Sequence, residues 1–424
     1  MTMQIVIIGN SAAGLSALEA FREKDQSSRV TIVTKEEKRP YSRVLLPYYL
    51  RGKIPYENLF IRDKDYYTRM NAKCIIGNVV KLLPEQQSIL LENKTLLPYD
   101  RLLIATGSSP VKPPIPGLSG KGIFHLWNLA DVQNMAPYFK KNKRLVVLGS
   151  GFVSLQGAWA ARSKGLTVSV VELMDRIMPR VLDDHAAGLL AAGMKKSGVD
   201  LHVNTLTRKI ERTEDGKLVL HFKGGNTLAA DVIIVGTGVQ PNVDFTAGTK
   251  ISIDEGIVVD KQMKTTLPGV YAAGDVAQVP STFGGEPVVH ALWPTAIETG
   301  RIAGTCMAGE NVVYQGSLNM NVTQMFNITV ASMGDFIDFE GTESWADKSL
   351  PKDQYLKILM KKGIPVGAVC AGSSELISTL GCLRPLIRGK VRIQGGPGVL
   401  KAMLAKEIVQ HHQAFAKRNN PCVS

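Results

Sequence analysis

The chain has 424 residues, of which 45% are hydrophobic and 21% charged, the proportions of a globular protein with two to three domains. No run of about 18 apolar residues occurs, so we expect no membrane-spanning helix. A strand is expected almost at Met3, which leaves no room for a signal peptide. The net charge of +13 fits either a solvated basic surface or docking to an acidic partner, whereas no recognition motif supports nucleic acid.

The cysteines are scattered along the chain and form no Cys-x-x-Cys pair. This spacing argues against a structural zinc ion or an iron–sulfur cluster held by this chain alone, so no metal site is expected. It also fits a reducing compartment, and we expect the protein in the cytoplasm. The five positions are Cys74, Cys306, Cys370, Cys382 and Cys422.

The first chemical signal is a strand that runs directly into a glycine-containing turn. Residues 5–8 are four apolar β-formers, and residues 9–14 follow as Gly-x-Ser-x-x-Gly. Gly9 permits the sharp turn, and Gly14 allows the next helix to pack closely on the strand. Ser11 replaces the middle glycine and is small enough to be tolerated. The free N–H groups and positive dipole end of such a helix predict a pyrophosphate site.

The chain contains this unit twice. Residues 144–148 form a second apolar strand, and residues 149–154 form a second turn, in which Ser154 takes the place of the third glycine. The helices that follow the two turns are expected over residues 15–22 and 155–162. Two phosphate-binding units in one chain predict two dinucleotides.

The strand after the first unit should end in an acid that holds the adenosine ribose. Residues 29–34 form this strand, and Glu36 is the best candidate. In residues 39–50, an aromatic residue, an arginine and apolar residues together would line a flavin site, with Arg43 near the pyrophosphate. A core helix with a solvated arginine explains the same segment, so both interpretations stay open.

The corresponding acid of the second unit is Glu172, at the end of a strand expected over residues 167–172. A carboxylate there hydrogen-bonds the ribose hydroxyls and repels a 2′-phosphate. It therefore predicts NAD(H) in preference to NADP(H). Arg176 and Arg180 follow, so the preference need not be absolute.

A strand that leads into Thr-Gly also occurs twice. Residues 101–104 lead to Thr106 and Gly107, and residues 231–235 lead to Thr237 and Gly238. Together with the two turns and the two acids, this repeat indicates an internal duplication. Further strands are expected over residues 74–76, 79–80 and 88–91, with linkers at 111–117 and near Asp244.

A further strand, over residues 269–272, ends in Gly274 and Asp275, and a helix is expected over residues 294–308. The Asp275 carboxylate would accept hydrogen bonds from a ribityl chain, or it caps a helix, and the local sequence favours neither.

From about residue 317 the pattern changes to that of a separate α+β unit. Residues 322–330 and 355–360 are expected as antiparallel strands, with a turn at residues 361–363. Helices follow and end with residues 401–417. We expect no chemistry from this unit.

Taken together, these motifs resemble the FAD-dependent pyridine nucleotide–disulfide oxidoreductase superfamily over nearly the whole chain. The resemblance is closest to rubredoxin and ferredoxin reductases, the FAD region of nitrite reductase, and the flavin subunit of NADH-dependent phenylglyoxylate dehydrogenase. It implies an α/β fold with two Rossmann-like, glutathione-reductase-like dinucleotide-binding domains and a C-terminal α+β interface domain. The implied boundaries are 1–112 with 244–316 for FAD, 113–243 for NAD, and 317–424 for a homodimer or hetero-oligomer interface.

The resemblance also implies which residues bind the cofactors FAD and NAD(H). For FAD they are Gly9, Ser11, Ala13, Gly14, Glu36, Arg43, Val80, Thr106, Gly107 and Asp275. For NAD they are Gly149, Gly151, Phe152, Val153, Glu172 and Gly238.

Three departures from the family pattern argue against electron transfer through a redox cysteine and against a charged Lys–Glu pair near the flavin. The disulfide-reducing members carry Cys-x4-Cys after the first unit, but residues 1–61 contain no cysteine. Members with a single redox cysteine match at Pro47, which places Val44 at the thiol position. Tyr48 and Gln156 stand where ferredoxin reductases carry a Lys–Glu pair. We expect no certain catalytic residue, and Gln156 is the candidate for orienting the nicotinamide.

The sequence therefore predicts an FAD-dependent oxidoreductase that moves electrons between NAD(H) and an iron–sulfur carrier or subunit, without a redox cysteine. The favoured form is the NAD(H)-reacting flavin subunit of a multi-subunit dehydrogenase. A stand-alone rubredoxin or ferredoxin reductase, or an NADH diaphorase or oxidase, is the second hypothesis. A redox-sensing flavoprotein that binds nucleic acid is the third.

Overall fold

The computed structural model describes residues 2–36, 39–396 and 398–404. The chain divides into two compact units, each built from separate segments. The first unit contains residues 1–111, 127–132 and 238–318, and the second contains residues 112–126, 133–237 and 319–424. The predicted domain boundaries stay a prediction. Of the helix predicted over residues 401–417, the part from residue 405 onward lies outside the described residues.

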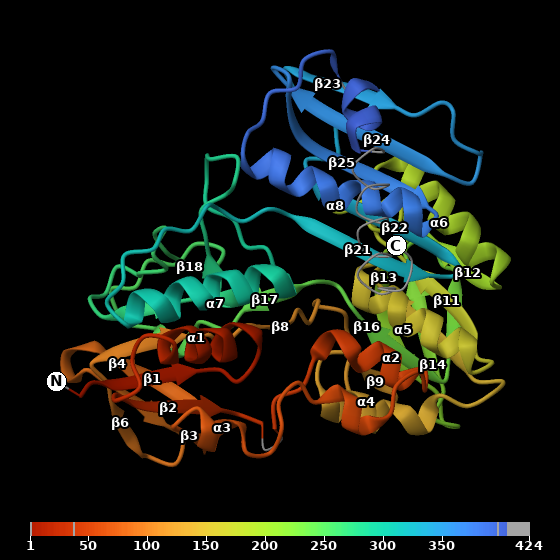
Figure 1. Cartoon of the computed structure of the whole chain (residues 1–424). Helices are drawn as coiled ribbons and strands as arrows, with labels where there is room; N and C mark the ends of the chain where they lie inside the picture. Colours follow the sequence, from red (N-terminus) through yellow and green to blue (C-terminus); the bar gives the residue numbers. More distant parts are fainter. Residues whose placement is uncertain (1, 37–38, 397, 405–424) are drawn as a thin grey trace, which may run out of the picture. The chain divides into compact units, whose positions relative to one another are not determined.

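The first unit is built on a five-stranded parallel sheet in the order β19-β7-β1-β2-β3. Figure 1 labels three of these strands, β1, β2 and β3. β1 carries four buried apolar residues in succession, the pattern of a strand covered on both faces. The strand order changes direction between β1 and β7, where sheets of this kind bind their ligands. The strands are β1 (Gln4–Ile8), β2 (Arg29–Thr34), β3 (Ala72–Ile76), β7 (Arg101–Ile104) and β19 (Val270–Ala272).

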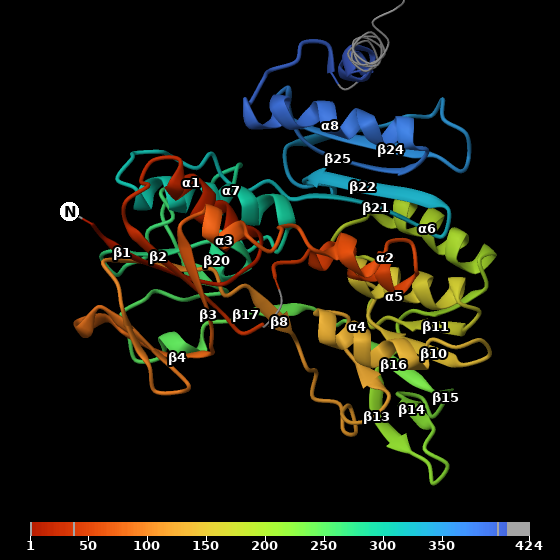
Figure 2. The ribbon, with the colours of Figure 1, turned by 60° about the horizontal axis from the view of Figure 1, so that its bottom comes forward.

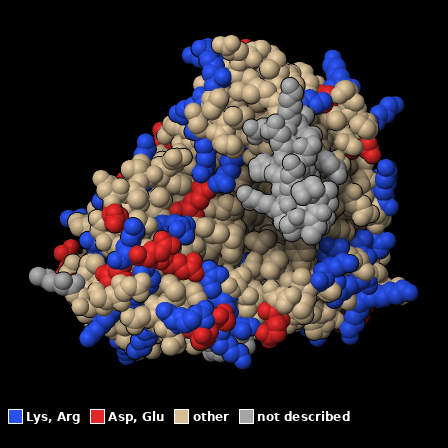
Figure 3. Space-filling view, in the orientation of Figure 1, with Lys and Arg blue, Asp and Glu red and all other residues tan. Residues whose placement is uncertain are grey.

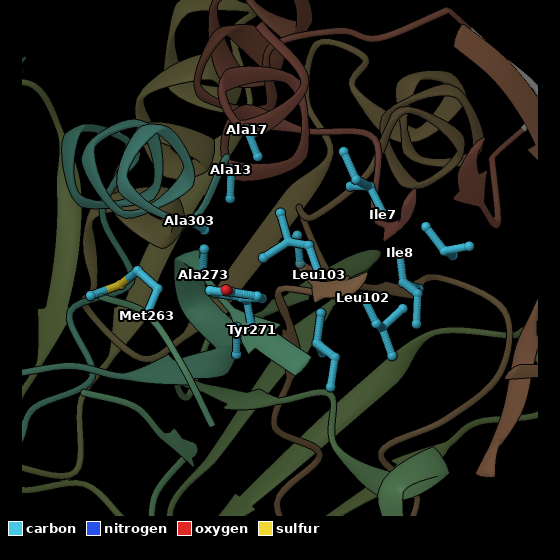
Figure 4. Close-up of a cluster of buried hydrophobic side chains, with 14 of the residues drawn as sticks. Ile7, Ile8, Ala13, Ala17, Leu102, Leu103, Met263, Tyr271, Ala273 and Ala303 are labelled. Carbon is cyan, nitrogen blue, oxygen red and sulfur yellow. The ribbon is translucent and has the colours of Figure 1, made fainter. Parts of the chain in front are cut away.

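Two helices of the first unit, α1 (Ala12–Arg22) and α7 (Trp293–Met307), pack against each other. A Cβ atom at Gly300 would lie 2.3 Å from the carbonyl oxygen of Ala13, and one at Gly304 would lie 2.2 Å from that of Ala17. Both contacts advance in the same direction, so the two helices run parallel. Figure 4 shows the alanine side chains of these helices beside the apolar side chains of the sheet.

The second unit contains a parallel sheet of the same design, in the order β12-β11-β10-β16-β9. The turns after the two central strands are closed by equivalent bonds: Gly9 N–H donates to Val33 O at 2.9 Å, and Gly149 N–H to Val171 O at 2.8 Å. The predicted internal duplication is confirmed. The strands are β9 (Ile123–Phe124), β10 (Arg144–Leu148), β11 (Thr167–Val171), β12 (Val199–His202) and β16 (Val232–Val235).

The helices of the two repeated units begin earlier than predicted. α1 begins at Ala12, and α5 (Phe152–Ser163) begins at Phe152, three residues before each predicted start. The reason is that Ser11 and Gly151 adopt the extended conformation of an N-cap, so the residues directly after them are already helical.

Smaller sheets accompany both parallel sheets, and they repeat as well. An antiparallel β4-β5-β6 sheet in the first unit corresponds to β13-β14-β15 in the second. No helix in the described part of the chain has the length and apolar content that a bilayer crossing needs. The strands are β4 (Val79–Leu83), β5 (Ser88–Leu91), β6 (Leu96–Pro98), β13 (Thr207–Arg212), β14 (Leu218–Phe222) and β15 (Thr227–Ala230). The remaining elements are the pairs β8 (Ser108–Pro110) with β17 (Val239–Pro241) and β18 (Ile257–Val258) with β20 (Ala277–Gln278), and the helices α2 (Leu46–Leu50), α3 (Tyr66–Arg69), α4 (Leu129–Met135) and α6 (Asp184–Lys196).

The C-terminal part of the second unit is an antiparallel sheet in the order β21-β22-β25-β24-β23. Residues 322–330, predicted as a single strand, instead form a hairpin that turns at Phe326 and Asn327, where φ is +51° and +62°. Asn327 suits this conformation but phenylalanine rarely adopts it, so the sequence carries only half of a turn signal there. The turn predicted at residues 361–363 is confirmed. The elements are β21 (Met320–Met325), β22 (Ile328–Gly334), β23 (Thr342–Ala346), β24 (Tyr355–Lys361), β25 (Ile364–Gly372) and α8 (Ser374–Arg388).

Helices pack against this C-terminal sheet from both sides. α8 and α6 both contact β22 and β25, and Figure 2 shows them on opposite faces of the sheet. The side chains of β25 are accordingly almost all buried.

Asp25 closes the loop after α1 through hydrogen bonds from Ser27 and Ser28. Its Oδ1 atom accepts from both backbone N–H groups, at 2.8 and 2.9 Å, and its Oδ2 atom accepts from the Ser28 hydroxyl at 2.5 Å. Burial alone would raise the pKa of Asp25, but the hydrogen bonds from Ser28 and Ser27 lower it to about 2. Since this lies below the unfolded value, the stabilisation is complete above about pH 5 and is lost as the pH falls toward 2.

We expect Asp25→Asn to lower the free energy of unfolding at pH 7 by roughly 1 kcal/mol, after allowance for solvent screening. Urea unfolding from pH 7 down to pH 3 measures the effect. The difference from the wild type should stay constant above about pH 5 and shrink below about pH 4. The exposed Asp353 provides the control, since Asp353→Asn should change little. A loss independent of pH would contradict the role of the ionised carboxylate.

Candidate functional site

The turn after β1 brings three segments of backbone close together. Gly9 has a φ of +126°, and a Cβ atom there would lie 2.0 Å from the carbonyl oxygen of Ala105. A Cβ atom at Gly14 would lie 2.0 Å from the carbonyl oxygen of Gly9. Only glycine avoids these overlaps, so the two positions hold β1, β7 and α1 at close range.

The start of α1 leaves backbone donors available. Ser11 is the N-cap residue, and its hydroxyl makes no capping hydrogen bond within the described chain. Leu15 N–H makes the first helical bond, to Ser11 O at 2.9 Å. The N–H groups of Ala12, Ala13 and Gly14 therefore lie outside the helical ladder, at the positive end of the helix dipole. A pyrophosphate fits this arrangement.

Glu36 and Arg43, predicted separately, lie together in the first unit. Arg43 Nη2 forms an ion pair with Glu36 Oε1, and Arg43 Nη1 donates to the carbonyl oxygen of Trp127 at 2.9 Å. Burial raises the pKa of Tyr41, whose ring centre lies 5.7 Å from the guanidinium carbon of Arg43. The segment is a 3-10 turn followed by the short helix α2, which buries Leu46 and Leu50 as a core helix does. The arginine is half-buried and paired, so the solvated arginine of the alternative interpretation is wrong.

Asp275 lies in a 3-10 turn after β19, and its Oδ2 atom accepts a hydrogen bond from Ser108 Oγ at 2.9 Å. The carboxylate does not cap α7, so the helix-cap interpretation is wrong. Burial raises the pKa of Asp275, while Ser108 and the charge of Arg43 oppose this change.

Thr106 and Gly107 are held by Asn242. Thr106 Oγ1 donates to Asn242 O at 2.8 Å, and Asn242 Nδ2 donates to Thr106 O at 2.9 Å. Asn242 N–H donates to Gly107 O at 3.0 Å. Val80 lies on β4 with 42% of its surface exposed and takes no part in this network.

The second glycine turn has the same close approach between turn and strand. Gly149 has a φ of +91°, and a Cβ atom there would lie 2.3 Å from the carbonyl oxygen of Gly236. The hydroxyl of Ser154, at the third glycine position, donates to Gly236 O at 3.3 Å, so this small side chain bridges the helix and the end of β16. The other predicted residues of the turn are exposed or half-buried at the start of α5: Gly151, Phe152 and Val153.

Glu172 is buried and held by the second turn itself. Its Oε2 atom accepts from Ser150 N–H at 2.9 Å and from Ser150 Oγ at 2.5 Å, and its Oε1 atom accepts from Met174 N–H at 2.9 Å. The Ser150 hydroxyl in turn accepts from Met178 N–H at 3.0 Å. A carboxylate has about four acceptor positions, so about one position on Oε1 is left for a ribose hydroxyl.

The two arginines after Glu172 differ in their surroundings. Arg176 forms ion pairs with Asp175 and Asp184, both at 3.2 Å. Arg180 is exposed. Because two carboxylates already surround its guanidinium group, Arg176 is poorly placed to attract a 2′-phosphate.

Gln156 and Gly238 differ from the other predicted NAD residues in their surroundings. Gln156 is 6% exposed, and its Nε2 atom donates to Thr323 Oγ1 at 2.7 Å and to Gln324 O at 3.2 Å, both on β21. Its Oε1 atom is buried and has no partner among the described residues. Gly238 has a φ of +112° and belongs to the first unit, whereas the other predicted NAD residues belong to the second.

The described cysteines lie far along the chain from the first glycine turn, on β3, α7, β25 and α8. Burial raises the pKa of the Cys74 and Cys306 thiols, and it raises that of Cys370 to about 12. These thiols are therefore protonated and poorly nucleophilic near pH 7. The described residues contain no cluster of three or more His, Cys, Asp or Glu side chains that could hold a metal ion.

The partners of the two acids were not predicted. Ser150 is the residue between Gly149 and Gly151 in the second turn, and Ser108 follows Gly107 directly. Asn242, which holds Thr106, was not predicted either. It directly follows β17, 136 residues from Thr106. Ser150 could have been proposed from its place between two glycines, but Ser108 and Asn242 depend on contacts between distant segments.

Three comparisons place the chain among known proteins. The pyridine nucleotide-disulphide oxidoreductase family matches residues 3–300. The epsilon subunit of the NADH-dependent phenylglyoxylate dehydrogenase of Aromatoleum evansii is 32% identical over 368 residues, covering 86% of this chain and 87% of that protein. The NAD(P)H nitrite reductase of Bacillus subtilis strain 168 is 30% identical over 381 residues, covering 88% of this chain but 46% of that protein. The structure of the covalent putidaredoxin reductase–putidaredoxin complex matches with a TM-score of 0.87 at 23% identity, covering 97% of this chain and 99% of that chain.

The fold is thus the α/β architecture of two Rossmann-like units that the sequence predicts. The chain belongs to the pyridine nucleotide-disulphide oxidoreductase family. It is an oxidoreductase, and the cofactors of this family are FAD and NAD(H).

Proposed function

We propose that the chain moves electrons between NAD(H) and an iron–sulfur carrier or subunit, as the NAD(H)-reacting flavin subunit of a multi-subunit dehydrogenase. One observation carries this proposal: the segment in which thiol-dependent relatives are expected to hold a redox cysteine contains none. Val44 stands at that position, 55% exposed at the turn before α2. An isopropyl group can neither form a disulfide nor act as a thiolate, so a bound flavin has to serve as the relay.

The residues of the first unit fit an FAD. The glycine turn is a cradle that a Cβ atom would fill, and the N–H groups at the start of α1 would bind the pyrophosphate. Glu36 would accept from the adenosine ribose, with Arg43 near the phosphates, and Asp275 would accept from the ribityl hydroxyls. A bound flavin supplies hydride acceptance and single-electron release, which no side chain offers. The full proposed set is Gly9, Ser11, Ala13, Gly14, Glu36, Arg43, Val80, Thr106, Gly107 and Asp275.

The residues of the second unit fit an NAD(H). Glu172 would hold the ribose through the remaining acceptor position on Oε1, and the turn at Gly149 would hold the pyrophosphate. Gln156 would orient the nicotinamide once its side chain turns from β21, because its Oε1 atom is buried in this structure. The full proposed set is Gly149, Gly151, Phe152, Val153, Glu172 and Gly238, with residues 1–112 and 244–316 as the FAD domain and 113–243 as the NAD domain.

The partner is proposed from the names of the relatives. One is an epsilon subunit of a larger dehydrogenase, and others are named as reductases of rhodocoxin, ferredoxin and rubredoxin. We propose that residues 317–424 form the homodimer or hetero-oligomer interface. A cytoplasmic location is part of the same proposal, because it rests on the scattered cysteines.

Oxygen-free purification from the native source tests this function, with size, flavin and iron measured on the active peak. The proposal expects a large peak that contains flavin, iron and other polypeptides. A peak of one or two copies with flavin and no iron would contradict the subunit role. Reduction of added rubredoxin or ferredoxin by that peak would then indicate a stand-alone reductase, and rapid NADH consumption with oxygen alone would indicate an NADH oxidase.

A further inference from the structure

A group of lysines lies at the amino edge of the parallel sheet in the second unit. The strands β10, β11 and β12 begin at Arg144, Thr167 and Val199, and the turn before each of them is basic. We define the basic edge as six exposed lysines on the segments that lead into these strands, the last two of them at the end of α6: Lys140, Lys141, Lys143, Lys164, Lys195 and Lys196. In Figure 3, Lys and Arg side chains gather along the right-hand edge, where Figure 1 places α6 and β12.

Direct contacts hold the three turns side by side. Asn142 N–H donates to Gly165 O at 3.2 Å, which joins the first turn to the second. Arg162 joins the second turn to the third, because it donates to Leu166 O at 2.9 Å and to Ser197 O at 2.8 Å. The six lysines therefore belong to one continuous surface.

Two carboxylates lie near the basic edge, Asp231 before β16 and Asp200 on β12, and Asp200 pairs with His202 at 2.7 Å. Asp231, at the start of β16, lies 3.7 Å from Lys143 Nζ and 3.5 Å from Arg144 Nε. The other five lysines form no ion pair with any described residue. Like charges on one surface repel one another, and an anionic partner surface would relieve the repulsion between these lysines.

The edge lacks the two features by which proteins commonly recognise nucleic acid, namely free arginine forks and stacking aromatic side chains. Arg162 already donates to backbone carbonyls and Arg144 is paired with Asp231, so both arginines of these turns are engaged within the protein. The exposed cations are lysines, which act as point charges rather than as planar forks for phosphate. No aromatic side chain on these turns provides a platform for stacking bases.

The position of the edge separates it from the cofactor. The glycine turn and Glu172 follow the opposite, carboxyl ends of β10 and β11. Each of these strands is five residues long, which corresponds to about 17 Å. A partner bound at the basic edge would therefore leave the predicted NAD site uncovered.

We propose that the basic edge binds an acidic protein surface. The second part of the proposal is that this contact anchors a partner subunit and is not the route by which electrons reach that subunit. The second part rests on the proposed function, whereas the docking itself does not. Electrostatic complementarity of this kind speeds association and fixes orientation.

The test is the binding of a fluorescent 20-residue polyglutamate peptide to the purified holoprotein, measured by anisotropy. The edge variant combines Lys140→Glu, Lys141→Glu, Lys164→Glu and Lys196→Glu. A control variant with the same change in net charge combines Lys73→Glu, Lys94→Glu, Lys250→Glu and Lys261→Glu, at exposed lysines of the first unit. We expect the edge variant to lose at least tenfold in affinity and the control less than threefold, and we expect wild-type binding to weaken steeply with salt.

Equal losses in both variants would overturn the proposal, since they would reflect net charge alone. Tighter binding of a 20-base-pair DNA duplex than of the peptide, lost in the edge variant, would also overturn it and assign the surface to nucleic acid. Anaerobic reduction of the flavin by NADH is followed separately in both variants. Its absence in the wild type would count against the proposed function but not against the docking surface.

Discussion

Replacement of Gly14 by alanine should abolish stable flavin binding. The added Cβ atom would lie 2.0 Å from the carbonyl oxygen of Gly9, so α1 would have to move away from β1. That movement would displace the N–H groups proposed to hold the pyrophosphate. We expect a loss of at least about 3 kcal/mol in the free energy of unfolding, as for severe overpacking, and a flavin-to-protein ratio below one tenth of the wild-type value. Absorbance of the purified variant and urea unfolding measure the two effects.

Gly188 provides a matched control on α6, because a Cβ atom there would meet no atom within 4 Å. Gly188→Ala should retain flavin and be as stable as the wild type or slightly more stable, since alanine favours helix over glycine. A yellow, fully loaded Gly14→Ala protein would show that the first turn does not bind the flavin.

Replacement of Glu172 by alanine should weaken NADH use and relax the preference for NADH over NADPH. The carboxylate accepts hydrogen bonds from Ser150 and Met174, so its removal leaves buried donors unsatisfied, each costing about 1–3 kcal/mol. It also removes the charge that would repel a 2′-phosphate. We expect the KM for NADH to rise at least tenfold, and the NADH-to-NADPH ratio of kcat/KM to fall at least tenfold. Because the ratio is measured on one preparation, a change in the fraction of folded enzyme cancels.

Ser150→Ala completes a graded series with Glu172→Ala. It removes the hydroxyl that donates to Oε2 and accepts from Met178 N–H, but it keeps the carboxylate, so its effect on the same ratio should lie between wild type and Glu172→Ala. An unchanged ratio in Glu172→Ala would refute the ribose assignment. Equal effects in both variants would show that the turn, and not the charge, sets the preference.

Local patterns were enough to predict the repeated units. The strands at 29–34, 88–91, 101–104 and 144–148 have the predicted bounds, because continuous apolar runs bounded by turn residues are strong local signals. The role of Gly14 was also predictable, since close helix–strand packing follows from its place in the motif.

Features that depend on tertiary context were not predictable. The hairpin at Phe326 was missed because a positive φ at a buried phenylalanine is imposed by packing, in this case against α5 and α6. The hydrogen bonds of Ser108 to Asp275 and of Ser150 to Glu172 join residues 167 and 22 positions apart. The sequence therefore singled out these acids as candidates, but it did not predict which groups hold them in the fold.

The most direct test of the central claim is an anaerobic titration of the purified protein with NADH, followed through the flavin absorbance. The proposed function assigns electron storage to the bound flavin and none to a thiol pair. We expect the flavin absorbance to bleach completely after about one equivalent of NADH per flavin, and we expect the same stoichiometry after alkylation of exposed thiols. Uptake of about two equivalents of NADH, or loss of the reaction on alkylation, would reveal a thiol relay. Either result would contradict the proposal that the flavin works without a redox cysteine.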